Sequence, residues 1–185
     1  EKALPSEIMG NLAGNTEAFK KTFRELTVLI ILAIFVIYII LGILYENFLH
    51  PFTPLSALPV AVFGGLITLL VFRQTLSIYA LIGLIMLIGI VMKNGILIVD
   101  FALEEIELNK KTPFDAVVSA CLVRFRPILM TTLAAMMGSV PVALGIGGTI
   151  SEGRAPLGIV VVGGLIFSQI VTLFVLPAFF LFVSQ

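Results

Sequence analysis

The chain has 185 residues, of which 59% are hydrophobic and 12% charged, and its mean hydropathy is +1.18. A soluble domain carries about 25% charged residues, so this composition indicates a membrane protein. The formal net charge is zero, which gives no support for a nucleic-acid partner. A single cysteine excludes an intrachain disulfide, and a single histidine argues against a transition-metal site, so we expect no cofactor.

The first residues, 1–24, are polar and lack the basic and then apolar order of a signal peptide. We therefore expect the chain to begin partway through a longer protein, with a transmembrane domain over 25–185. Five runs in it are long and apolar enough to cross the ~30 Å hydrocarbon core as helices. They cover about 26–45, 55–72, 77–103, 127–146 and 157–183. The predicted fold class is an all-α membrane protein with a bundle of five transmembrane helices.

The basic residues between the spans predict the orientation of the chain. The connection at 104–126 contains Lys110, Lys111, Arg124 and Arg126, whereas the loops near Arg73 and Arg154 contain one basic residue each. The positive-inside rule therefore places this connection in the cytoplasm, with the C-terminus on the same side and the N-terminus outside. Lys20, Lys21 and Arg24 oppose this orientation, unless they end a large translocated domain, which largely escapes the rule.

The 104–126 connection also has a helix-start signal. Thr112 is an expected N-cap, followed by Pro113 at the first helical position and by the acidic Asp115. Apolar residues then recur at helical spacing, which predicts an amphipathic helix over about 113–125, lying along the cytoplasmic interface. Its simplest interpretation is a connecting helix without a binding role of its own. Elsewhere, small residues four apart predict close helix packing: Ala57/Ala61, Ala134/Gly138 and Gly164/Ser168.

Lys93, with Asn94 beside it, lies well inside the third apolar run. A charged residue at a helix centre costs about 2.5–3.5 kcal/mol on insertion scales and usually faces a protein interior or an aqueous path. Asp100 is seven residues further on, about 10 Å along the axis, which is too far for a direct ion pair. Snorkelling to the headgroups is the alternative, but a lysine reaches only ~6 Å. The other acids lie at or beyond the ends of the runs, so the partner of Lys93 is expected outside this chain.

A second polar pattern opens the fourth run. Arg124 and Thr131 are seven residues apart and share a helix face, which fits a proton or water path, while Arg126 is interpreted as an interfacial anchor. No catalytic set is found: there is no second histidine, no suitable Ser/Lys or Asp/Asp pair, and no phosphate-binding loop. We therefore expect no enzyme.

Several segments together carry a family resemblance that extends over nearly the whole chain. They are "NLAGNTEAFKKTF", "LGILYENFLHPFTPLSALPVAVFG", "GLIMLIGIVMKNGILIVDFALE", "RFRPILMTTLAAMMGSVPVAL" and "PLGIVVVGGLIFSQIVTLFVLPAFF". In this order they resemble the end of the second periplasmic loop and the eighth to twelfth helices of resistance–nodulation–division (RND) multidrug efflux permeases. Within this family, the residues of these segments most resemble the Mdt-type branch of the hydrophobe/amphiphile exporters.

The resemblance implies a role for the polar residues. RND permeases are proton antiporters of the inner membrane in which a lysine of the tenth helix pairs with two aspartates of the fourth. Lys93 matches that lysine and Asn94 its neighbour, while Arg124 and Thr131 match the arginine and threonine that complete the relay. The coupling ion would be the proton, and the partners would be the rest of a trimeric permease, a periplasmic adaptor and an outer-membrane channel.

The chain departs from the complete family pattern, because it contains no paired aspartates and no porter domain, where drugs bind. It would therefore supply only the Lys/Arg/Thr half of the relay. Two alternatives stay open: a different RND branch, for metals or as a protein-export auxiliary, and a non-transporting membrane scaffold that stabilises a partner.

Overall fold

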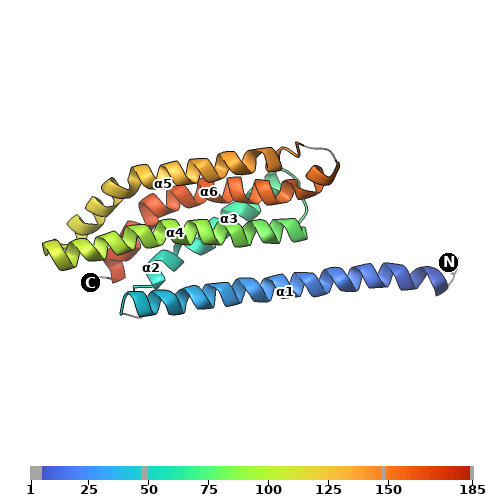
Figure 1. Cartoon of the computed structure of the whole chain (residues 1–185), viewed down its shortest axis with the longest axis horizontal. Helices are drawn as coiled ribbons and strands as arrows, with labels where there is room; N and C mark the ends of the chain where they lie inside the picture. The colour runs from blue at the N-terminus through green and yellow to red at the C-terminus, as the bar shows by residue number, and fades with distance from the viewer. Residues whose placement is uncertain (1–5, 47–49, 147–148, 184–185) are drawn as a thin grey trace.

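The fold was examined in a computed structural model, which describes residues 6–46, 50–146 and 149–183. Within these ranges the chain is entirely helical (Figure 1). The helices are α1 (Ser6–Leu44), α2 (Phe52–Leu55), α3 (Ala57–Val71), α4 (Ile78–Asn109), α5 (Pro113–Ala143) and α6 (Thr149–Val183).

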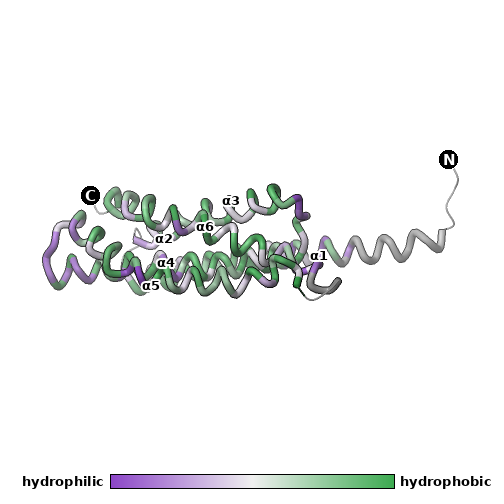
Figure 2. The backbone as a smooth tube through the Cα atoms, turned by 90° about the horizontal axis from the view of Figure 1, so that it is seen from above, coloured by the Kyte–Doolittle hydropathy of each residue, from purple (hydrophilic) through white to green (hydrophobic). Residues whose placement is uncertain are grey.

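Five helical stretches are long and apolar enough to span a membrane. They are Phe19–Leu44, Phe52–Val71, Ile78–Asn109, Pro113–Ala143 and Glu152–Ile170, the last of which is followed by the shorter apolar stretch Thr172–Val183. Apolar residues run along the bundle, and hydrophilic residues gather at the α4–α5 connection (Figure 2). The predicted all-α fold with five spans is confirmed.

The core of the bundle lies where α6 packs against α3, α4 and α5. Glycines permit this close packing, because a side chain at these positions would collide with atoms of the neighbouring helix. A Cβ on Gly83 would lie 2.9 Å from the carbonyl oxygen of Leu157, and one on Gly158 would lie 2.8 Å from that of Ser139. A Cβ on Gly164 would clash with the side chain of Leu87. These contacts fix the distances between α6 and its neighbours.

Helix α1 lies apart from the other long helices over much of its length (Figure 1). In its most apolar window 6% of the residues are buried, compared with 56% in α4. A single stripe, which includes Ile30, Ile34, Ile37 and Leu41, packs against the core. The helix has 39 residues and is about 58 Å long, well beyond the ~30 Å hydrocarbon core. The described part of the polar segment 1–24 is thus a helical extension of the first span.

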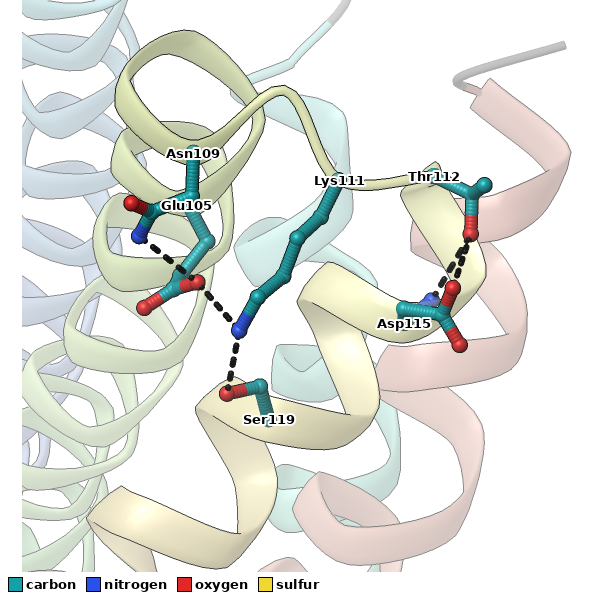
Figure 3. Close-up of polar contacts among 6 residues, drawn as sticks. All are labelled: Glu105, Asn109, Lys111, Thr112, Asp115 and Ser119. Atoms are coloured by element: carbon teal, nitrogen blue, oxygen red, sulfur yellow. Dashed lines mark hydrogen bonds and ion pairs between the residues drawn. The ribbon is translucent and has the colours of Figure 1, made fainter.

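Side-chain contacts hold the tight connection between α4 and α5 (Figure 3). Lys110 ends α4 in the left-handed conformation, with φ of 50°. The ammonium group of Lys111 then reaches both helices, at 2.6 Å from Oε2 of Glu105 and 3.4 Å from Oγ of Ser119. Thr112 is the N-cap of α5, and its Oγ1 accepts a hydrogen bond from the backbone N–H of Asp115. The predicted helix start is confirmed.

The predicted boundary between the helix over 113–125 and the fourth span is wrong. Both form one continuous helix, α5, which passes through Pro127. Proline removes one backbone hydrogen bond, but membrane helices tolerate this loss because neighbouring helices and small local adjustments satisfy the freed carbonyl. The first turns of α5 slant toward the end of α4, and the rest runs beside α6 (Figure 1). The predicted location of its first turns at the interface stays a prediction.

Replacing Gly158 by valine should destabilise the bundle by about 1–3 kcal/mol, because the new side chain would overpack α6 against α5. The contacting atoms include backbone atoms of Ala143 and Ser139, which cannot rotate away. Gly153→Val in the same helix is the matched control, since no atom lies within 4 Å of its Cβ position. Thermal unfolding of the purified protein in detergent measures both variants, and equal midpoints would contradict the packing described above.

Candidate functional site

Lys93 lies near the middle of α4, 15 residues after Ile78 and 16 before Asn109. Its side chain is exposed on the surface of the bundle and makes no ion pair or hydrogen bond with any described residue. Asp100 is also exposed and is not paired with it. The lysine is therefore placed about 23 Å from either end of the helix without a counter-ion in the described part of the chain.

Lys93 belongs to a surface that we call the open face. It comprises exposed residues of α4 and α5: Met86, Gly89, Lys93, Asp100, Thr131, Ala134 and Gly138. No atom lies within 4 Å of a Cβ built on Gly89 or Gly138, in contrast to the glycines packed inside the bundle. Small residues let helix backbones approach closely, so this face has the shape to receive another helix.

The three pairs of small residues thus fall into two groups. Ala57/Ala61 and Gly164/Ser168 are buried inside the bundle, as their spacing predicts. Ala134 and Gly138 are exposed and lie on the open face, so no described helix packs on them. The spacing signals close packing without telling which helix is the neighbour.

Asn94 points away from the open face, although it directly follows Lys93. It is 3% exposed, and its Nδ2 donates a hydrogen bond of 3.2 Å to Oγ1 of Thr132, which is 1% exposed. Thr131 is exposed and donates its hydroxyl hydrogen bond to the carbonyl of Ile128 in its own helix. Thr132 is not among the predicted site residues, and its only signal in the sequence is its place beside Thr131.

Arg124 lies in the seam between α4 and α5. Its guanidinium carbon is 5.0 Å from the ring centroid of Phe101, and its Nε is buried without a hydrogen-bond partner among the described residues. Such a cation–π contact stabilises the charge and fixes the direction of the side chain. Of the four predicted relay residues, the structure brings Lys93 and Thr131 to the open face and places Asn94 and Arg124 at the seam beside it.

A cleft of about 730 Å³ near the C-terminal end of α4 was not predicted. Its polar lining is Tyr45, Glu46, His50, Asp100, Glu104 and Glu107. Burial lowers the pKa of His50. Its ring stacks on that of Phe180, with 6.3 Å between the two ring centroids. The signal for this cleft in the sequence was the helical spacing of the three acids of α4 that line it, Asp100, Glu104 and Glu107. In the described ranges, no group of three or more His, Cys, Asp or Glu side chains is arranged to hold a metal ion.

These features define a multi-pass α-helical membrane protein with an exposed face, containing the unpaired Lys93, that no described helix covers. The chain belongs to the AcrB/AcrD/AcrF family, whose family model matches residues 1–184.

The chain is 51% identical over 182 residues to "Multidrug resistance protein MdtC" from two Escherichia coli strains, UTI89 and K12 DH10B. The alignment covers 98% of this chain and 18% of each relative. An X-ray crystal structure of a heavy metal efflux pump is also similar, with a TM-score of 0.78 and 31% sequence identity. That similarity covers 91% of this chain and 16% of the pump. The chain therefore spans less than a fifth of the proteins to which it is similar.

Proposed function

We propose that this chain is the C-terminal transmembrane part of an RND permease that exports drugs or other amphiphiles, driven by the proton-motive force. Membership of the AcrB/AcrD/AcrF family and 51% identity to a multidrug resistance protein support this proposal. The remainder of the permease, including the residues that select the substrate, would lie outside this chain.

The observation that carries the proposal is the exposed, unpaired ammonium group of Lys93 in the middle of α4. In a membrane this charge requires a partner or an aqueous path. Among the acidic residues of α4, α5 and α6, Asp100 is seven residues from Lys93, about 10 Å along the helix axis and too far for a direct ion pair. The others lie near helix ends: Glu104, Glu105, Glu107, Asp115 and Glu152. The counter-ion is therefore a carboxylate of another helix seated on the open face, and the family resemblance assigns it to a pair of aspartates.

The proposed cycle transfers one proton through that pair. A carboxylate oxygen takes a proton from the periplasmic side and becomes neutral, so it no longer attracts the ammonium group of Lys93. The helices then rearrange, and the proton leaves to the cytoplasm when the carboxylate ionises again beside Lys93. Thr131 offers a hydroxyl on the same face, and Arg124, oriented by Phe101, adds positive charge that favours the ionised carboxylate.

The proposed location is the bacterial inner membrane, with a periplasmic N-terminus and with the 104–126 connection and C-terminus in the cytoplasm. The basic residues of that connection support this orientation. The complete permease would act as a trimer with a periplasmic adaptor and an outer-membrane channel. No step of the cycle makes or breaks a covalent bond of the substrate, so the protein would be a secondary transporter.

Replacing Lys93 by alanine in the complete permease should lower proton-driven efflux at least about tenfold. Without the cation, the ionised form of the paired carboxylates loses its stabilisation, so they release their protons less readily to the cytoplasm. Efflux of ethidium, an amphiphilic cation, from cells that contain equal amounts of permease measures the loss. Lys110→Ala is the matched control, since Lys110 is exposed in the α4–α5 connection. Unchanged efflux in Lys93→Ala would refute the relay assignment.

A non-transporting scaffold would differ from the proposed transporter in its response to Lys93→Ala, while both would depend on the open face. It should tolerate Lys93→Ala, and it should lose its partner when the open face is blocked. Gly138→Leu places a bulky side chain where a helix would be seated, whereas Gly153→Leu places it in open space on α6. We expect Gly138→Leu to reduce the amount of assembled permease and its ethidium efflux several-fold, with Gly153→Leu near wild type. Native gel electrophoresis and efflux measure both; equal behaviour would mean that no helix packs on Gly138.

A further inference from the structure

The hydrogen bond between Asn94 and Thr132 crosses from α4 to α5 inside the bundle. Both side chains are more than nine-tenths buried, and they are 38 residues apart in sequence. Two other hydroxyl groups of α5 bond within the helix: Thr131 to the carbonyl of Ile128, and Ser139 to that of Ala135. A bond within one helix says nothing about its neighbour, whereas the bond from Asn94 fixes α4 and α5 relative to each other.

The direction of this bond determines where the preceding residues point. Each residue of an α-helix is rotated by about 100° from the one before it. Helices α4 and α5 are antiparallel neighbours (Figure 1), so one step back from two facing residues turns both side chains to the same side of the pair. One step back from Asn94 is Lys93, and one step back from Thr132 is Thr131. The exposure of both residues on the open face agrees with this geometry.

We propose that Asn94 and Thr132 are positioning residues, which act as a register clamp that keeps Lys93 level with Thr131 and facing the same way. This inference rests on the proposed proton relay and gives Asn94 a different part in it, since its buried side chain lies away from the open face. Oδ1 of Asn94 is buried and has no partner among the described residues. The bond to Thr132 is thus the contact that orients the amide. A slide or rotation of α5 against α4 breaks it and separates the two relay groups.

The test compares Thr132→Val with Thr132→Ser in the complete permease, with ethidium efflux measured across external pH. Valine has the shape of threonine without the hydroxyl, and serine keeps the hydroxyl. The nearest charged groups that α4 and α5 contribute on this side are Asp100, about 10 Å along α4 from Lys93, and Arg124, about 10 Å along α5 from Thr131, and neither is changed. In Thr132→Val we expect the proposed ion pair between Lys93 and the carboxylate of the partner helix to weaken. The carboxylate pKa then rises and the pH midpoint of efflux moves upward by roughly half to one unit. Thr132→Ser should keep the wild-type midpoint.

Ser139→Ala is the matched control, because it removes a buried hydroxyl of α5 that bonds within its own helix. Its midpoint should equal that of the wild type, as measured at equal permease content in the membrane. The proposal is overturned if Thr132→Val has an unshifted midpoint, if Thr132→Ser shifts as much as Thr132→Val, or if Ser139→Ala shifts equally. If Thr132→Val does not accumulate, Asn94→Ser takes its place, since its hydroxyl is too short to reach across. An unshifted midpoint there also overturns the proposal.

Measuring Lys93→Ala in the same experiment distinguishes failure of the proposed proton relay from failure of the proposed clamp. Unchanged efflux in that variant refutes the proton relay and the clamp with it. Loss of efflux in Lys93→Ala, together with a wild-type midpoint in Thr132→Val, refutes the clamp alone.

Discussion

A lysine halfway along a membrane helix is the constraint on which the rest of this structure depends. Lys93 lies too deep to reach the headgroups at either end of α4, and hydrocarbon cannot stabilise its charge. The acids of α4 all follow Lys93 by seven residues or more, which is about 10 Å or more along the axis. The described bundle therefore leaves the charge of Lys93 without a counter-ion, and this charge lies on the open face.

The two sides of α4 differ in how they are packed. Toward α6, glycines bring helices close enough for backbone contacts: Gly83 approaches Leu157, and Leu87 fills the space over Gly164. Toward the open face, Gly89 and Gly138 have the same chemistry and no neighbour. A glycine costs helix stability, so one with nothing against it is poorly explained by the described bundle alone. The small residues and the unpaired charge thus point to the same surface, where a helix with a carboxylate would satisfy both.

Sequence patterns predicted the spans well, because about 20 consecutive apolar residues have few stable alternatives to a membrane helix. The capping signal at Thr112 placed the start of α5 correctly for a similar local reason. The break expected before Pro127 is wrong, because a proline rule taken from soluble helices ignores how packed neighbours compensate for one lost hydrogen bond. Small-residue spacing predicted close packing, but whether a pair is inside the bundle depends on tertiary structure, as Gly164 and Gly138 illustrate.

For the candidate site, the sequence proposes which residues belong to it but does not give the arrangement of their side chains. The sequence places Asn94 beside Lys93, which suggests a shared role, yet 100° of helical rotation sends one side chain to Thr132 and leaves the other exposed. Arg124 and Thr131 share a face by spacing, but contact with Phe101 holds the arginine at the seam. The structure thus places an exposed side chain and a buried, hydrogen-bonded one at adjacent positions on α4 and again on α5. Under the proposed relay, the exposed pair would face the partner helix and the buried pair would set its geometry, so each short motif in the sequence would contain both kinds of residue.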